Sequence, residues 1–262
     1  VDLTQYYTFA TSGQYTDLVN SPYSFARTTD LAKLYGLSTV WDGTASTLTP
    51  FPTAQPRTGL LTRAAFLISG TEYSDPIIKG KNVRFNVLCQ VLPPPPPTVN
   101  VVPVREDSTH TTRWLVEQAT AGTSSNPAQC LQCHGSMNPL GFVSEDYDSL
   151  GRYRTHELKF DDTTGVQNGS VPVNTPDVGA LFPGDTQLLQ DAVALDAYIA
   201  QLGMGQRCMA VQYFRYAFGR QEVPAQDGCT LESMRQTVAN DTLLQMFAAT
   251  TAQRQFLYRQ VQ

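Results

Sequence analysis

The 262-residue sequence lacks the features that define several large classes of protein. Charged residues make up only 16% of it, and the net charge of −5 comes without a basic cluster, which argues against a nucleic-acid-binding surface. No stretch reaches the roughly 18 apolar residues that a membrane-spanning helix requires. A G-x-S-x-G nucleophile elbow and a glycine-rich phosphate loop are also missing. The hydrophobic content of 41% still predicts a globular protein with a substantial core.

Patterns for metal binding are sparse as well. The sequence has only three histidines. The acidic segment "SEDYDS" contains Glu145, Asp146 and Asp148, but it lacks the glycine and the terminal glutamate of an EF-hand loop. We expect this segment to be a solvated helix end.

The apolar periodicity predicts a mainly α fold with one small β excursion. In "TTDLAKLYG", Thr29 is a candidate helix cap and Gly36 a stop signal. Between Tyr153 and Val178, turn residues among alternating apolar positions predict a hairpin. Further helices are expected at 60–69, 75–92, 111–120, 191–203, 206–220, 230–240 and 242–258.

Five consecutive prolines, Pro93 to Pro97, interrupt the helical pattern. A helix cannot continue through them, so we expect a polyproline II segment that acts as a stiff connector rather than as a ligand for an aromatic groove. This segment suggests a division into a helical N-terminal region, 1–100, and a second region, 101–262.

The chemistry of the sequence is concentrated in "CLQCH", where Cys130, Cys133 and His134 form a C-x-x-C-H motif. Asn126 and Pro127 are good helix-start residues, so the motif should occupy the first turns of a helix. C-x-x-C-H is typical of covalent c-type haem attachment. A structural zinc site would need a second ligand pair, and a thioredoxin-like dithiol would need a βαβ unit. Neither accompanies the motif, but zinc binding and chance occurrence remain alternatives.

Three stretches together resemble one family: residues 57–100, 130–154 and 208–222. The first contains "DPIIKGKNVRFNVLCQVLPPPPP", the second is "CLQCHGSMNPLGFVSEDYDSLGRYR" and the third is "CMAVQYFRYAFGRQE". They are similar to the C-terminal domains, themselves uncharacterised, of large exported cytochrome c-like proteins of planctomycetes and myxobacteria-type deltaproteobacteria. The resemblance implies a mainly α, cytochrome c-like haem-binding helical core with a small β-hairpin and long proline-rich loops.

The resemblance also implies roles for individual residues. Cys130 and Cys133 would form thioether bonds to one haem c, and His134 would be the proximal iron ligand. The segment "MNPLGF" resembles the family's Met-Asp-Pro-Leu-Gly-Phe, with asparagine in place of aspartate, and Met137 should pack beside the haem. Arg152 and Arg154 are candidates for binding the haem propionates, with ordinary surface ion pairs as the alternative.

The sixth iron ligand is not determined by the sequence. Met137 is too close to His134 to reach the opposite face of the porphyrin. Met204 and His156 are better separated, and an open sixth position is a further alternative.

Haem attachment implies export to an oxidising compartment, in which the other cysteines can form a disulfide. We predict a Cys208–Cys229 disulfide, with Cys89 left as a buried thiol or as a replacement partner. The aromatic helix near Tyr213 and Phe214 should belong to the core rather than wall a haem pocket.

These features predict an exported, periplasmic or cell-surface monohaem c-type cytochrome module that transfers single electrons within a larger redox assembly. Its partners would be other cytochromes or redox subunits, including an N-terminal portion that the family carries, since Val1 suggests a processed or truncated form. The alternatives are a peroxidase-like or oxidase-like enzyme with an open iron position and a structural subunit stapled by haem.

Overall fold

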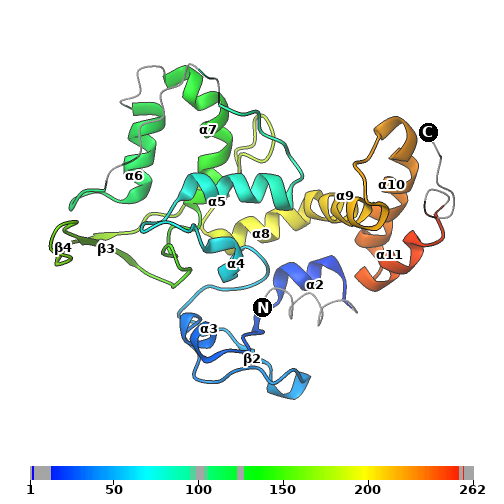
Figure 1. Cartoon of the computed structure of the whole chain (residues 1–262), viewed down its shortest axis with the longest axis horizontal. Coiled ribbons are helices and arrows are strands. Elements are labelled where there is room, and N and C mark those ends of the chain that lie inside the picture. Colours follow the sequence, from blue (N-terminus) through cyan, green and yellow to red (C-terminus); the bar gives the residue numbers. More distant parts are fainter. Residues whose placement is uncertain are drawn as a thin grey trace.

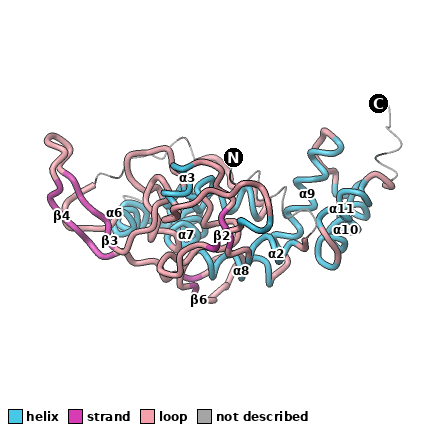
Figure 2. The backbone as a smooth tube through the Cα atoms, turned by 90° about the horizontal axis from the view of Figure 1, so that it is seen from below, coloured by secondary structure: helices cyan, strands magenta, loops and turns pink. Residues whose placement is uncertain are grey.

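The computed structural model describes residues 2, 13–95, 97, 104, 106–122, 127–253 and 256. Over these residues the protein is mainly α, with three small antiparallel two-stranded sheets. Figure 1 shows an elongated molecule, with the β3–β4 hairpin at one end and helices α9, α10 and α11 at the other. Helices α5, α7 and α8 lie between them, and Figure 2 shows the same order along the long axis. No helix in the described part is both long and apolar enough to cross a membrane.

The first elements build a small layer beneath the central helices (Figure 1). They are α2 (Tyr15–Asn20), β1 (Tyr23–Ser24), α3 (Thr29–Leu34), the 3-10 helix η1 (Ala45–Thr47), β2 (Thr49–Pro50) and α4 (Ala64–Leu67). The cap of α3 is Thr28, one residue before the predicted Thr29, because its side chain accepts a hydrogen bond from the Leu31 N–H. The predicted stop at Gly36 is confirmed by its left-handed φ of 70°. The predicted helix at 60–69 is reduced to the four residues of α4.

The central elements combine α-helices with two π-helices. They are α5 (Pro76–Asn82), the π-helix η2 (Val83–Val87), α6 (Thr112–Glu117), the π-helix η3 (Gln118–Gly122) and α7 (Pro127–Phe142). Pro76 is at the start of α5, as predicted, and the Asp75 side chain caps that helix by accepting from the Ile78 N–H. Pro93, Pro94, Pro95 and Pro97 belong to neither helix nor strand, and Pro96 lies outside the described residues.

The rest of the chain supplies the small sheets and the last helices. The predicted hairpin is confirmed as β3 (His156–Phe160) paired with β4 (Gln167–Pro172), and β5 (Asp177–Val178) pairs with β6 (Leu188–Leu189). Helices α8 (Ala192–Gln201), α9 (Met204–Phe218), α10 (Pro224–Asn240) and α11 (Leu243–Thr250) follow. Asp191 caps α8 and Gly219 ends α9, as predicted, whereas α10 begins six residues before the expected Thr230.

One hydrophobic cluster runs through the middle of the molecule and joins α2, η2, α7, α8 and α9, with further residues from α10 and α11. The aromatic helix contributes to it as predicted: Phe214 is fully buried and stacks on Phe218, with ring centroids 4.4 Å apart. Tyr216 is the exception, since it is 83% exposed.

Helices α5 and α7 cross with their backbones in contact. A Cβ atom at Gly80 would lie 2.0 Å from the Met137 carbonyl oxygen, and one at Gly141 would lie 1.8 Å from that of Pro76. No side chain fits at either position, because real Cβ atoms do not approach backbone atoms so closely. The glycine of "MNPLGF" is therefore required by this helix crossing.

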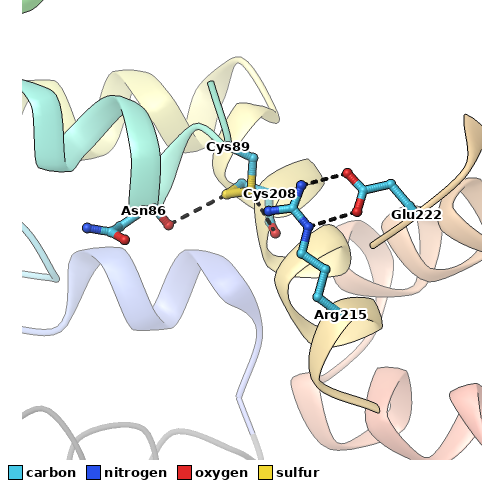
Figure 3. Close-up of a disulfide and its surroundings, with 5 residues drawn as sticks. All are labelled: Asn86, Cys89, Cys208, Arg215 and Glu222. Atoms are coloured by element: carbon cyan, nitrogen blue, oxygen red, sulfur yellow. Dashed lines mark hydrogen bonds and ion pairs between the residues drawn. A yellow bond between two sulfur atoms is a disulfide. The ribbon is translucent and has the colours of Figure 1, made fainter. Parts of the chain in front are cut away.

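The disulfide joins Cys89 to Cys208, so the predicted Cys208–Cys229 pairing is wrong. Figure 3 shows the bridge between the end of η2 and α9, with the Arg215–Glu222 ion pair nearby. Its Cα atoms are 5.2 Å apart. Cys229 is an exposed thiol on α10. Chain proximity favours Cys229, whereas the packing of η2 against α9 brings Cys89 to Cys208 across 119 residues, so Cys89 is the replacement partner that the sequence left open.

A buried carboxyl group links α8 to the first layer and predicts a pH-dependent stability. Asp196 is fully buried, and its Oδ2 accepts from the N–H groups of Leu60 and Leu61 at 2.6 and 3.2 Å. Its Oδ1 has no hydrogen-bond partner in the described structure. Burial raises the pKa of Asp196 from 3.8 to about 7.

The folded protein therefore keeps a proton that the unfolded chain loses as pH rises from about 4 to about 7. Asp196 should make the free energy of unfolding fall across that interval, by on the order of 4 kcal/mol at most, and then level off. The D196N variant, measured by urea unfolding between pH 4 and 8, should show a shallower fall than the wild type. The exposed Asp241 provides the control, because D241N should retain the wild-type profile. An unchanged profile in D196N would contradict this assignment.

Candidate functional site

The C-x-x-C-H motif lies in the first half of α7, as predicted. Asn126, the expected cap, lies outside the described residues, but the helix does begin at Pro127. Cys130 and Cys133 are one turn apart, so they lie on one side of the helix, and neither belongs to the disulfide. Both thiols and the His134 ring are half-buried. These side chains are accessible to a group that approaches α7 from outside.

The His134 ring is held by a chain of hydrogen bonds that ends on η3. Its Nδ1 lies 3.0 Å from Oδ1 of Asn138, and the Asn138 Nδ2 donates to Oγ1 of Thr120 at 3.1 Å. The Thr120 hydroxyl in turn donates to the Val116 carbonyl oxygen at 2.8 Å. Since an amide oxygen can only accept, the neutral His134 ring carries its proton on Nδ1 in this arrangement, which leaves the Nε2 lone pair for a metal.

Asn138, in the "MNPLGF" segment after the motif, therefore has a specific role beside His134. It is buried, and it is positioned one helical turn after His134. Metal-binding histidines usually donate their other ring N–H to a fixed acceptor, which sets both tautomer and ring orientation. An aspartate at this position would accept in the same way but could not donate to Thr120. The role of Thr120 cannot be predicted from the sequence, because it depends on contact between η3 and α7.

Both π-helices pack against α7. The η3 helix supplies Thr120, and η2 supplies Arg84, whose Nε donates to the Ser136 carbonyl oxygen at 2.9 Å. The π-helical turn is rare and is often found at functional sites. Two such turns beside the helix that carries the motif single out this region of the molecule.

The donor set is chemically suited to a covalently attached haem. It offers two thiols one turn apart, followed by an imidazole with its Nε2 available. Within the described ranges, no group of three or more His, Cys, Asp and Glu side chains converges as around a metal ion. The second ligand pair that a structural zinc site requires is therefore missing from this part of the chain.

The other predicted cofactor-binding residues have different surroundings. Met137 is buried on α7. Arg152 is exposed and donates to Asp148 at 2.6 Å, which is the surface ion pair given as its alternative. Arg154 is half-buried and lies 3.3 Å from Glu145 and 3.7 Å from Glu157. Both arginines thus already have carboxylate partners, and their propionate contacts stay predictions.

The two candidates for the sixth ligand lie on separate elements. His156 is exposed at the start of β3, with its Nδ1 3.2 Å from the Thr155 hydroxyl. Met204 begins α9 and packs against the central cluster. Figure 1 shows the hairpin and α9 on opposite sides of α7. The structure brings neither element to the first turns of α7, and the sixth ligand stays a prediction.

The segment that follows α7 is buried, so the expected solvated helix end is wrong. Glu145 is 2% exposed; it accepts from the Ser74 hydroxyl at 2.6 Å and from Lys79 at 3.2 Å. Asp146 is also buried, and burial, followed by the nearby Asp191 carboxylate, raises its pKa to about 7. The acidic segment is therefore a structural connection between α5 and the end of α7.

The same buried network continues into the hairpin. Arg154 links Glu145 to Glu157, and Lys159 pairs with both Glu157 and Glu106. Burial raises the pKa of Glu106, whereas Glu157 has a lowered pKa because Arg154 and its hydrogen bonds outweigh burial. The network fixes the hairpin to the centre of the molecule.

Comparison with known proteins gives a match to part of the chain. Residues 57–157 match the family model described as PSCyt3, protein of unknown function (DUF1588), a family of planctomycete cytochrome c-like domains. This segment is less than half of the chain and contains α4, α5, η2, α6, η3 and α7. The similarity therefore covers the helix crossing and the motif helix but not α8 to α11. No curated protein and no solved structure matches the chain.

Proposed function

We propose that this chain is an exported monohaem c-type cytochrome module that transfers single electrons within a larger redox assembly. The observation that carries the proposal is the arrangement on α7, where two thiols precede an imidazole. Its Nδ1 is hydrogen-bonded to Asn138, which donates in turn to Thr120. The partial match to a cytochrome c-like family is consistent with it. The Cys89–Cys208 disulfide favours an oxidising compartment outside the cytoplasm.

Each residue of the site has a defined task in this proposal. Cys130 and Cys133 hold the haem by thioether bonds, and His134 is the proximal ligand. Asn138 and Thr120 keep the imidazole in one tautomer and one orientation. A bound haem c supplies a one-electron couple, while burial, hydrogen bonding and axial ligands of the protein set its potential. Other cytochromes or redox subunits, including a further portion of a longer protein, are the proposed partners.

Covalent haem content tests the proposal directly. The chain is exported to the periplasm of a bacterium that expresses the c-type cytochrome maturation proteins, purified, and analysed by pyridine haemochrome spectroscopy. We expect one haem per chain that survives denaturation and acid–acetone extraction. The C130S/C133S variant should lose all covalent haem, whereas C229S, which changes a cysteine far along the chain, should retain it. Absence of covalent haem from the wild type, under conditions that load a control cytochrome, would refute the proposal.

Carbon monoxide then separates electron transfer from catalysis. A reduced spectrum with sharp low-spin bands that carbon monoxide does not change means two protein ligands and supports an electron carrier. A high-spin spectrum that shifts on carbon monoxide binding means an open iron position and favours a peroxidase-like or oxidase-like enzyme.

A further inference from the structure

Six basic side chains are buried in the described structure, and five of them either pair with a carboxylate or lie against aromatic rings. The six are Arg57, Arg63, Lys79, Arg84, Arg113 and Lys159. Four form ion pairs with carboxylates. The guanidinium of Arg57 lies between two aromatic rings, 5.0 Å from that of Tyr35 and 4.4 Å from that of Tyr147.

Arg84 is the exception. It is 6% exposed, and in the described structure no carboxylate forms an ion pair with it. All 23 acidic residues of the sequence lie in the described ranges, so no acidic side chain is left elsewhere to fill that role. Burial lowers the pKa of Arg84, and no neighbouring carboxylate offsets this shift. A buried guanidinium without a counter-charge is unfavourable, which suggests that an anion from outside the chain completes it.

The guanidinium of Arg84 is partly satisfied by neutral acceptors. Nε donates to the Ser136 carbonyl oxygen, Nη1 to the Gln90 amide oxygen and Nη2 to the Ala180 carbonyl oxygen. A guanidinium has five N–H donors, so two remain on the terminal nitrogens. Such a pair suits a carboxylate, which accepts two parallel hydrogen bonds from arginine.

The position of Arg84 connects it to the motif. Its acceptor Ser136 lies on α7, and the Ser136 hydroxyl donates to the Cys133 carbonyl oxygen at 2.9 Å. Large apolar side chains near Arg84 and its acceptors along the chain are exposed: Phe85 by 53%, Val91 by 76% and Phe182 by 46%. A buried cation whose chain neighbours expose apolar side chains is suited to a ligand with an apolar body and a carboxylate group.

We propose that Arg84 binds a carboxylate of the group attached to α7, and that this carboxylate is a haem propionate. The inference rests on the proposed function. It assigns the propionate contact to Arg84, on η2, in place of Arg152 and Arg154, whose charges are already paired.

The test compares one substitution in two backgrounds. R84Q is introduced into the haem-loaded protein and into the C130S/C133S chain, which cannot attach haem. Removing a charge-assisted contact to the propionate should lower the thermal midpoint of the loaded protein by roughly 5 °C more than that of the C130S/C133S protein. The midpoint potential of the loaded R84Q protein should also fall, because a positive charge near the iron favours the reduced state.

Controls keep the outcome specific. R235Q removes an exposed arginine of α10 and should change neither quantity, while R152Q and R154Q test the two residues suggested by sequence. If R84Q does not fold, R84K is used instead. It retains the charge without the planar fork, so the thermal midpoint and the midpoint potential should change in the same direction but by less. Equal destabilisation in both backgrounds with an unchanged potential would overturn the role of Arg84 while leaving haem attachment intact. A wild type without haem would instead overturn the proposed function.

Discussion

The C89S/C208S variant should be less stable than the wild type by about 2–5 kcal/mol in free energy of unfolding. The bridge closes a loop of 119 residues, for which the chain-entropy model gives a stabilisation of about 5 kcal/mol, and measured values are usually smaller. Urea unfolding followed by circular dichroism measures the difference. The reduced wild type should match the variant, since reduction also removes the bridge.

The alternative pairing is tested by the same measurement. C229S should unfold like the wild type, because Cys229 is exposed and outside the bridge. If C229S instead loses as much stability as C89S/C208S, then Cys208 pairs with Cys229 in solution. Mass mapping of a non-reduced digest identifies the linked peptides independently.

Glu145 should be among the side chains that the protein tolerates least well. E145Q leaves the buried Lys79 and the half-buried Arg154 facing a neutral amide, and removal of one partner from a buried ion pair destabilises by about 3–5 kcal/mol. Lys79 retains neutral acceptors in Ser74, Ser144 and Tyr147, so the protein should still fold. Urea unfolding at neutral pH measures the loss.

Two further variants make this prediction specific. E232Q removes an exposed carboxylate that pairs with Arg235 on the surface of α10, and it should leave the unfolding transition in place. K79M/E145L removes both charges of the buried pair and should recover part of the stability lost in E145Q, because no buried charge of that pair is then left alone. An E145Q protein as stable as E232Q would show that the network contributes little.

Much of the helical framework could be predicted from local signals. Asp191, Pro76 and Gly219 mark helix ends through capping chemistry that acts within one turn, and the structure places all three at such ends. The position of C-x-x-C-H on the first turns of a helix followed in the same way from Pro127.

The contacts between distant elements could not be predicted, because they depend on how the helices pack. Thr120 and Arg84 acquire their roles only when η3 and η2 contact α7, and the Cys89–Cys208 pairing likewise depends on the position of η2 beside α9. The hairpin shows a related difficulty. Its β3 strand buries Glu157 and Lys159 and exposes Leu158 and Phe160, which reverses the usual pattern and can be understood only from the ion network.

The Cys89–Cys208 bridge also turns the middle of the chain into a covalent ring. The ring includes α6, α7 and the β3–β4 hairpin, whereas α2 to α5 and the helices after α9 form two tails. A single peptide-bond break anywhere between Cys89 and Cys208 leaves both fragments in one molecule until the bridge is reduced. A nicked molecule would therefore keep α7 attached to the disulfide-linked core and migrate at full length without reductant.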